Sequence, residues 1–165
     1  MYEYSPKRTN TAARRLILLF FLGAAALILI TMMVPNVPFR WVFQLIAIGL
    51  LTAAIFLVTR YVTKLFLYRI ENGDLTVTEA DARGKRRITV CRVGVANIQS
   101  LERLDEPHAA NAALADLKKQ KIKLFDYTAD LRPADSILLV VREGGEDLAI
   151  RLSFDETLFE LLGER

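Results

Sequence analysis

The chain has 165 residues, of which 53% are hydrophobic, and its mean hydropathy is +0.27. These values are high for a soluble domain and indicate that apolar residues are concentrated in particular segments. The net charge is +3, and the sequence contains one cysteine, Cys91, and one histidine, His108. These counts exclude an intramolecular disulfide and a zinc site built from several cysteines and histidines, and a lone cysteine is compatible with a reducing cytoplasm.

Two apolar segments without charged residues, 16–34 and 41–59, are each 19 residues long. At about 1.5 Å per residue, a helix of this length spans about 28 Å, close to the thickness of the hydrocarbon core of a bilayer. We therefore predict two transmembrane helices. Between them, Pro35 and Pro38 end the first helix and restrict residues 35–40 to a short extracytoplasmic turn, so the helices are expected to form an antiparallel hairpin.

The distribution of basic residues predicts the orientation of this hairpin. Four basic residues lie in the N-terminal tail, residues 1–15, and several follow the second segment closely, whereas the turn holds only Arg40. Because Lys and Arg are retained on the cytoplasmic side, both termini are expected to be cytoplasmic, in a multi-pass protein of the inner or plasma membrane. The expected anchors at the membrane interface are Arg14, Arg15, Trp41, Arg60, Tyr61 and Lys64, with Phe39 and Tyr68 as further aromatic candidates. A cleaved signal peptide is the alternative for the first segment, but its long apolar run and the lack of an A-x-A site favour a retained helix.

The positive charge belongs to the predicted membrane part of the chain. Residues 1–65 contain seven basic residues and one acidic residue, whereas residues 66–165 contain 15 basic and 18 acidic residues. A mildly acidic soluble part argues against general nucleic-acid binding, so no nucleic-acid partner is expected.

A strand pattern begins directly after the second apolar segment, with no Pro-, Ser- or Gly-rich linker. Residues 41–65 are therefore assigned to the second helix and its interfacial extension, and residues 66–165 to a cytoplasmic domain. Alternating apolar residues and turn signals predict strands over 65–70, 75–80, 86–93 and 95–104, the first two joined by a hairpin at Asn72-Gly73. Glu106 as a cap and Pro107 at the first helical position then predict a helical insertion over residues 106–121.

The C-terminal part contains three further predicted strands and a helix. The strands cover residues 122–127, 136–143 and 147–152, the last two joined at Gly144-Gly145. Residues 153–163 are predicted to form an amphipathic helix, in which Ser153 and Glu156 have the spacing of a capping box. Such a helix can cover the open end that antiparallel strands leave.

The order of seven strands and a capping helix resembles the pleckstrin-homology (PH) superfold. Two membrane segments followed by the hairpin "LYRIENGDLTV" are similar to small bacterial membrane proteins that carry a bacterial PH-like domain. The resemblance covers both apolar segments and residues 66–165. It implies an α-helical membrane hairpin plus an α+β domain, a seven-stranded antiparallel PH-like open barrel with a helical insertion and a C-terminal capping helix. It also implies a binding or scaffolding module rather than an enzyme.

The first hairpin loop, residues 71–74, is acidic, whereas PH domains that bind phosphoinositides carry basic residues there. Head-group recognition of that kind is therefore not expected. The densest basic cluster of the soluble part lies in the second hairpin instead, and its candidate contacts to anionic lipid are Arg83, Lys85, Arg86 and Arg87. The alternative interpretation is a solvated turn whose charges discourage edge pairing. A second basic run, Lys118, Lys119, Lys121 and Lys123, is interpreted as complementing a helix dipole.

No catalytic pattern, Gly-rich phosphate loop or paired-carboxylate motif is present in the sequence. His108 stands at a predicted helix start, where a solvated histidine is expected rather than a general base. The chain is therefore expected not to be an enzyme and to need no cofactor.

Small residues in the two apolar segments suit close helix packing, and the candidates are Gly23, Ala26, Gly49 and Ala53. They can serve packing within the hairpin, self-association, or docking onto another membrane protein. Together these features predict a membrane-anchored interaction module that acts as an accessory or scaffold component at the inner leaflet, with membrane lipids and a further membrane protein or a second copy as partners. The alternative function is a sensor of anionic lipid through the basic hairpin.

Overall fold

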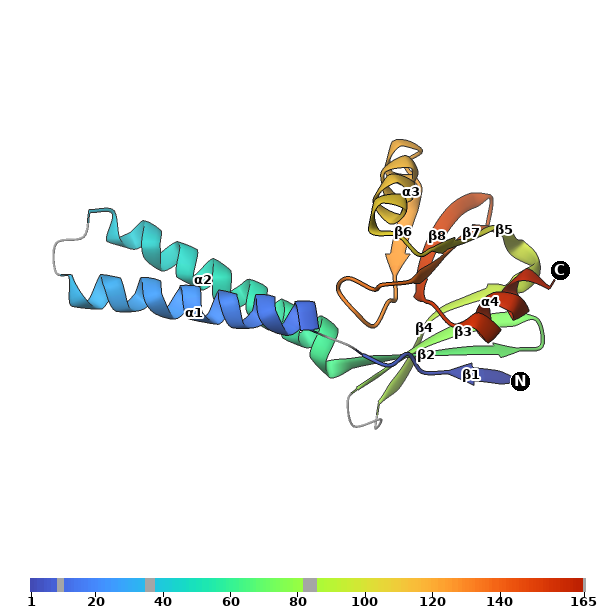
Figure 1. The fold of residues 1–165 in the computed structure, drawn as a ribbon, viewed down its shortest axis with the longest axis horizontal. Helices are drawn as coiled ribbons and strands as arrows, with labels where there is room; N and C mark the ends of the chain where they lie inside the picture. Colours follow the sequence, from blue (N-terminus) through green and yellow to red (C-terminus); the bar gives the residue numbers. More distant parts are fainter. Residues whose placement is uncertain (9–10, 35–37, 82–85, 165) are drawn as a thin grey trace. The chain divides into compact units, whose positions relative to one another are not determined.

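The computed structural model describes residues 1–8, 11–34, 38–81 and 86–164. The chain forms two compact units, one made of Met1–Arg8 together with Lys64–Arg165 and one made of Thr9–Thr63. The second unit contains the two long helices that Figure 1 shows, and the first contains the strands and two shorter helices.

The helical unit consists of α1 (Thr11–Met33), α2 (Arg40–Leu57) and a π-helical turn, η1 (Val58–Thr63). The helical segments Thr11–Met33 and Arg40–Thr63 are each long and apolar enough to cross a membrane. α1 begins before the predicted segment 16–34, because Thr11–Arg15 are already helical, whereas η1 lies within the second helix and interfacial extension predicted for residues 41–65.

Small side chains line the contact between α1 and α2. The buried residues are Ala13, Ala24 and Thr31 on α1 and Ala47 and Ala54 on α2. Small residues let two helix backbones approach closely, which is the usual basis of helix packing where no water drives association.

The strand unit contains two four-stranded sheets rather than the predicted seven-stranded barrel (Figure 1). The first sheet has the order β1-β2-β3-β4, and its strands are β1 (Tyr2–Tyr4), β2 (Lys64–Glu71), β3 (Asp74–Asp81) and β4 (Arg87–Gly94). The second has the order β5-β7-β8-β6, and its strands are β5 (Ile98–Leu104), β6 (Lys123–Asp126), β7 (Ser136–Glu143) and β8 (Glu146–Ser153). A single 3₁₀ turn, η2 (Val95–Asn97), joins β4 to β5.

The wholly antiparallel arrangement predicted from the sequence is wrong at one place, because β6 pairs with β8 in parallel. All other strand pairs are antiparallel. The hairpins predicted at Asn72-Gly73 and at Gly144-Gly145 are confirmed. Asn72 and Gly73 have φ values of 54° and 81°, and Gly144 and Gly145 have values of 59° and 88°, as a two-residue turn with positive φ at both positions requires.

The eighth strand is β1, within the segment expected to be a tail. Tyr2, Glu3 and Tyr4 pair with Ile70, Arg69 and Tyr68 of β2. Three residues are too few for a periodic pattern in the sequence, so the strand is recognised only from its pairing with the edge of β2. The N-terminal residues thereby become part of the domain, although the chain crosses the helical unit before it reaches β2.

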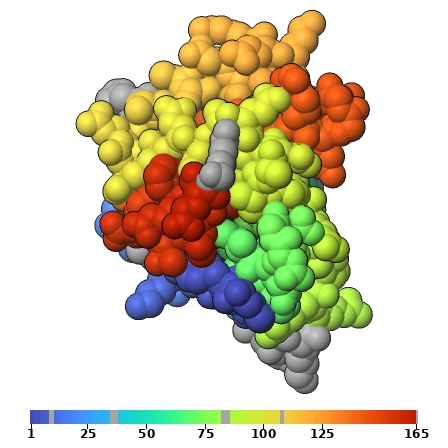
Figure 2. Space-filling model, turned by 90° about the vertical axis from the view of Figure 1, so that its right-hand side faces the viewer, coloured from blue at the N-terminus to red at the C-terminus, as the bar shows by residue number. Residues whose placement is uncertain are grey.

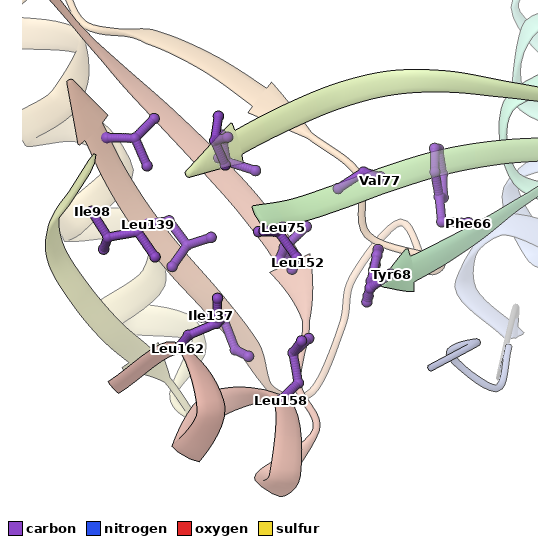
Figure 3. Close-up of a cluster of buried hydrophobic side chains, with 13 residues drawn as sticks. Phe66, Tyr68, Leu75, Val77, Ile98, Ile137, Leu139, Leu152, Leu158 and Leu162 are labelled. Atoms are coloured by element: carbon purple, nitrogen blue, oxygen red, sulfur yellow. The ribbon is translucent and has the colours of Figure 1, made fainter. Parts of the chain in front are cut away.

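The main core lies between the two sheets and is closed by α4 (Glu156–Gly163), as Figure 3 shows. Leu75 and Val77 extend into it from β3, Ile137 and Leu139 from β7, and Leu158 from α4. A second cluster lies on the opposite face of the second sheet, beneath α3 (Pro107–Lys119), and consists of Leu104, Ala110, Leu117, Leu138 and Ala149. Because β7 is covered on both faces, its sequence is a continuous apolar run rather than an alternation.

Tyr68, expected at the membrane interface, is instead fully buried in the main core. Its hydroxyl donates to the Tyr127 carbonyl oxygen at 2.7 Å and accepts from the Ser153 amide at 3.1 Å. Burial raises the pKa of Tyr68 to about 12. The polar end of this aromatic ring is thus satisfied inside the protein, which removes the reason to place it at a bilayer surface.

The cap of α4 also differs from the prediction. Asp155 is the N-cap residue, and its carboxylate accepts a hydrogen bond from the Leu158 amide at 3.0 Å. The predicted cap, Ser153, belongs to β8, and its hydroxyl accepts from the Ala129 amide at 3.0 Å. The sequence offers two suitable caps two residues apart, and the length of β8 decides between them.

Candidate interaction surfaces

At residues 63–64 the chain passes from the helical unit to the strand unit without a linker. The helical segment ends at Thr63 and β2 begins at the next residue, Lys64. The amine of Lys64, a predicted interface anchor, lies 3.0 Å from the Glu79 carboxylate on β3. The guanidinium of Arg60, another predicted anchor, lies 5.2 Å from the ring centre of Tyr61. Lys64 and Arg60 thus each have a side-chain partner within their own unit.

The remaining predicted anchors lie near helix ends. Arg14 and Arg15 are exposed in the first part of α1, and Trp41 is exposed in the first turn of α2. These positions suit interfacial anchoring, which stays a prediction.

The four small residues proposed for helix packing do not share one face. Gly23 faces α2, since a Cβ built there would come 3.4 Å from the Leu50 Cδ1 atom. Gly49 meets nothing within 4 Å, Ala26 is exposed, and Ala53 is half-buried. Packing within the hairpin thus involves Gly23 but not Gly49 or Ala26. Self-association through the latter two stays a prediction.

The basic hairpin between β3 and β4 is only partly described. Arg83 and Lys85 lie outside the described residues, whereas Arg86 and Arg87 are exposed. The Asp81 amide donates to the Arg86 carbonyl oxygen at 3.1 Å, and Arg87 pairs with Ala80 across the ladder. The described part of this cluster thus continues the β3–β4 ladder.

A surface that the sequence did not single out lies where α3 meets β6. All four residues of β6 are exposed, and Leu124 and Phe125 retain 40% and 42% of their accessible surface. Beside them is an apolar groove of about 510 Å³ between α3 and β6, whose lining includes Leu114, Ala115, Lys118 and Ile122. We call this groove together with β6 the α3–β6 surface.

The turn from α3 into β6 sets the shape of this surface. The Ile122 amide donates to the Leu117 carbonyl oxygen at 3.0 Å, and Lys121 has a φ of 59°. These are the marks of a Schellman motif, in which a left-handed residue follows the helix and glycine is the usual choice. Lys121 thus places a lysine directly before the groove residue Ile122, in a backbone conformation that side chains disfavour.

With this geometry established, the family follows from comparison. A family described as "Bacterial PH-like domain (DUF6106)" matches residues 1–164. The chain belongs to this family. The match begins before β1 and extends through α4, so the PH-like family includes the helical unit as well as the two sheets. No curated protein and no solved structure matches the chain.

The first hairpin of the PH-like domain uses its acidic residues internally. Arg92 on β4 lies 2.7 Å from the Asp74 carboxylate, and Arg69 on β2 lies 2.9 Å from that of Glu71. These exposed ion pairs contribute little stability, but they set the charge around the loop. A phosphate group would meet carboxylates at this loop.

A second groove of the PH-like domain, of about 600 Å³, runs between α3 and β5. Its lining includes Glu102, Asp116 and Asp147, and two of these acids are paired, Asp116 with Lys119 at 2.8 Å and Asp147 with Arg142 at 3.0 Å. These pairs raise the pKa of Lys119 and of Arg142. The groove carries acids but no convergent set of catalytic groups within the described residues.

The acidic side chains and the thiol of the PH-like domain are the groups that could bind a metal ion or act as a nucleophile. Among the described residues, no group of three His, Cys, Asp or Glu side chains is placed to hold a metal ion. Cys91 is half-buried opposite Val77, and burial raises the pKa of its thiol to about 11. A protonated thiol is a poor nucleophile at neutral pH.

Proposed function

We propose that the protein is a membrane-anchored PH-like interaction module that acts as a non-catalytic accessory or scaffold component at the inner leaflet. One observation carries the proposal: the chain enters the helical hairpin from a strand of the domain and leaves it into another strand of the same domain. β1 precedes α1, β2 follows η1 without a linker, and the two strands pair with each other.

The composition and exposure of the two helices support a membrane location. In the most apolar 18-residue stretch of each helix only 11% is buried, which is far less than in a core helix of a soluble protein. Leu18, Leu22 and Ile55 are among the many large apolar residues that the unit leaves exposed. A bilayer covers such a surface without loss of free energy, whereas water does not.

The pairing of β1 with β2 supports a two-span topology. Residues on either side of the hairpin belong to one sheet, so both must lie on the same side of a membrane. The basic residues on either side of the hairpin favour the cytoplasmic side for both termini. Cleavage after the first segment would remove β1 from the domain, so retention of both helices agrees better with the fold.

A doubly tied domain suits recognition of a neighbouring membrane protein. The chain joins this domain to its membrane anchor at both ends of the helical hairpin, so the domain stays close to the bilayer. Holding a binding module near the bilayer raises its effective concentration for a partner in the same membrane.

The test is extraction of the full-length tagged protein from its native membrane in mild detergent, followed by identification of stoichiometric partners. We expect a defined membrane protein to co-purify. Insertion of a flexible Gly-Ser linker between Thr63 and Lys64 is the matched variant, and it is expected to reduce recovery of that partner. Recovery of the protein alone, or turnover that depends on His108, would contradict the proposal.

A second candidate function is sensing of anionic lipid through Arg83, Lys85, Arg86 and Arg87. The exposure of Arg86 and Arg87 favours it, since each basic group near an anionic surface contributes about 1 kcal/mol. Amide exchange of β4 in full-length protein should slow in bilayers that contain phosphatidylserine, and charge reversal at the four positions should abolish the difference. Equal exchange with and without phosphatidylserine would reject this function.

A further inference from the structure

We propose that the outer edge of β6 is a strand-addition site for an extended, acidic segment of a partner protein. The inference rests on the proposed function, because it assigns the surface through which the interaction module would bind. It is carried by the backbone, the side chains and the charges of the α3–β6 surface.

The backbone of β6 is paired on one edge only. β6 ends the order β5-β7-β8-β6, and its register joins Lys123 to Leu148 and Asp126 to Arg151 of β8. Within the described residues no further strand follows β6, so its other edge presents backbone donors and acceptors to solvent. Such an edge is a template for another extended chain.

The side chains of β6 favour an added strand rather than a flat contact. Leu124 lies opposite Ala149 and therefore shares the face that α3 covers, whereas Phe125 lies opposite Ile150 and shares the face of the main core. The Phe125 ring stacks on that of Tyr127 at 6.4 Å. Because the two exposed apolar residues point to opposite faces, only a chain running along the edge can cover both.

The groove beside β6 provides a place for a side chain of the added strand. It lies on the Leu124 side and is lined from α3 by Leu114, Ala115 and Lys118. Residues of an added strand alternate between faces, so every second residue would enter this groove and the others would lie over Phe125. The expected ligand therefore has apolar residues that alternate in this manner.

The charges around the α3–β6 surface specify acidic flanks. Three exposed lysines belong to this region: Lys118 lines the groove, Lys121 directly precedes the groove residue Ile122, and Lys123 is the first residue of β6. Among the described residues, Glu146 pairs with this group, and its carboxylate lies 3.7 Å from the Lys123 amine, with both side chains more than two-thirds exposed. Such a contact is weak and exchangeable, so acids of a partner can replace it. Lys121 places its charge here from a left-handed backbone conformation, with a φ of 59°.

A bilayer is a less suitable occupant of this edge. Insertion of Leu124 and Phe125 into hydrocarbon would carry the unpaired backbone groups of β6 with them, and each such group in a bilayer costs several kcal/mol. A peptide strand satisfies the same groups through ladder hydrogen bonds. The geometry therefore favours a polypeptide over a lipid surface.

The experiment uses the full-length protein in nanodiscs of zwitterionic lipid, panned against a library of random linear peptides of about 12 residues. We expect enrichment of acidic peptides with alternating apolar residues and slowed amide exchange at Leu124 and Phe125 when they bind. Leu124→Ser should weaken the selected peptide about tenfold or more. The control is Ile88→Ser, which changes an exposed apolar residue on the edge strand β4, with 61% exposure against 40% for Leu124, and should leave binding unchanged.

A double variant tests the same surface with little risk of misfolding. Joint charge reversal, Lys118→Glu with Lys123→Glu, changes only exposed side chains and should weaken binding about tenfold at low salt and less at high salt. The proposal is overturned if no peptide is enriched over empty nanodiscs, if Leu124→Ser binds as tightly as the wild type, or if protection appears on another strand. Protection of β6 by phosphatidylserine alone would also overturn it, in favour of a membrane contact. A partner that co-purifies equally with wild type and Leu124→Ser would leave the proposed function standing and reject only this surface.

Discussion

The hydroxyl of Tyr2 donates a hydrogen bond to the carboxylate of Asp155, a residue 153 positions further along the chain. Asp155 is also the N-cap of α4, so one carboxylate fastens both the first strand and the last helix. Figure 2 shows the N-terminal residues in blue next to the C-terminal helix in red. The two ends of the chain are thus closed onto each other beside the main core.

This contact predicts that the N-terminus contributes to the stability of the domain. Tyr2→Phe removes one charge-assisted hydrogen bond and should lower the free energy of unfolding by about 1.5–3 kcal/mol. The measurement is thermal or chemical unfolding of the full-length protein in detergent, followed by near-UV circular dichroism. Tyr4→Phe is the control, because the Tyr4 hydroxyl lies at 3.5 Å from its acceptor, the Phe154 carbonyl oxygen, and should matter less. Equal effects of both variants would contradict the prediction.

A second prediction concerns the buried hydroxyl of Tyr68. Tyr68→Phe leaves the Tyr127 carbonyl and the Ser153 amide without this shared partner, so we expect a loss of about 1–3 kcal/mol in the free energy of unfolding. Had Tyr68 been an interfacial anchor, the same substitution would leave the stability of the domain nearly unchanged. Unfolding curves of the two proteins distinguish these outcomes.

The thiol of Cys91 gives a prediction for pH dependence. Burial raises its pKa from 9.0 to about 11, so the folded state keeps the proton more tightly than the unfolded chain. This contribution to stability is complete below pH 9 and disappears as the pH rises from 9 to 11. At pH 8 the folded protein should react with iodoacetamide about 100-fold more slowly than the unfolded protein. Equal alkylation rates in the presence and absence of denaturant would refute the shift.

The left-handed backbone of Lys121 predicts a stabilising substitution. Lys121→Gly should raise the free energy of unfolding by about 1 kcal/mol, because glycine adopts a φ of 59° without steric penalty. Lys119→Gly, two residues earlier and still in α3, should instead destabilise the protein by about 1 kcal/mol. If Lys121→Gly stabilises the fold and also weakens binding of the selected peptide, the loss of binding cannot be due to unfolding.

The helix contact predicts different tolerance at two glycines. Gly23→Leu forces atoms toward Leu50, where a Cβ alone already comes to 3.4 Å, and should lower the yield of folded protein in detergent. Gly49→Leu enters open space and should leave that yield unchanged. Size-exclusion chromatography of both variants also reports on self-association. A shift to smaller species for Gly49→Leu alone would show that its face mediates contact between copies.

The sequence determined those features that depend on neighbouring residues. Uncharged apolar runs predict both long helices, and Pro107 marks the start of α3. The pair Asn72-Gly73, whose residues readily adopt positive φ, predicts its hairpin. Each signal lies within one turn or one strand, where local sterics and periodicity are decisive. The direct passage from helix to strand at residues 63–64 was visible for the same reason.

Only the tertiary structure decided the features that depend on distant pairing. The strand β1 forms because the edge of β2 is available to it, and the paired residues Tyr4 and Tyr68 are 64 residues apart in the chain. Asp155 rather than Ser153 caps α4, because β8 continues through Ser153. Likewise, the parallel pairing of β6 with β8 leaves Leu124 and Phe125 at an open edge, although their sequence is typical of a covered strand. Hydrogen-bond partners and burial at these positions come from segments far apart in the chain, and no local pattern encodes which edge a strand will join.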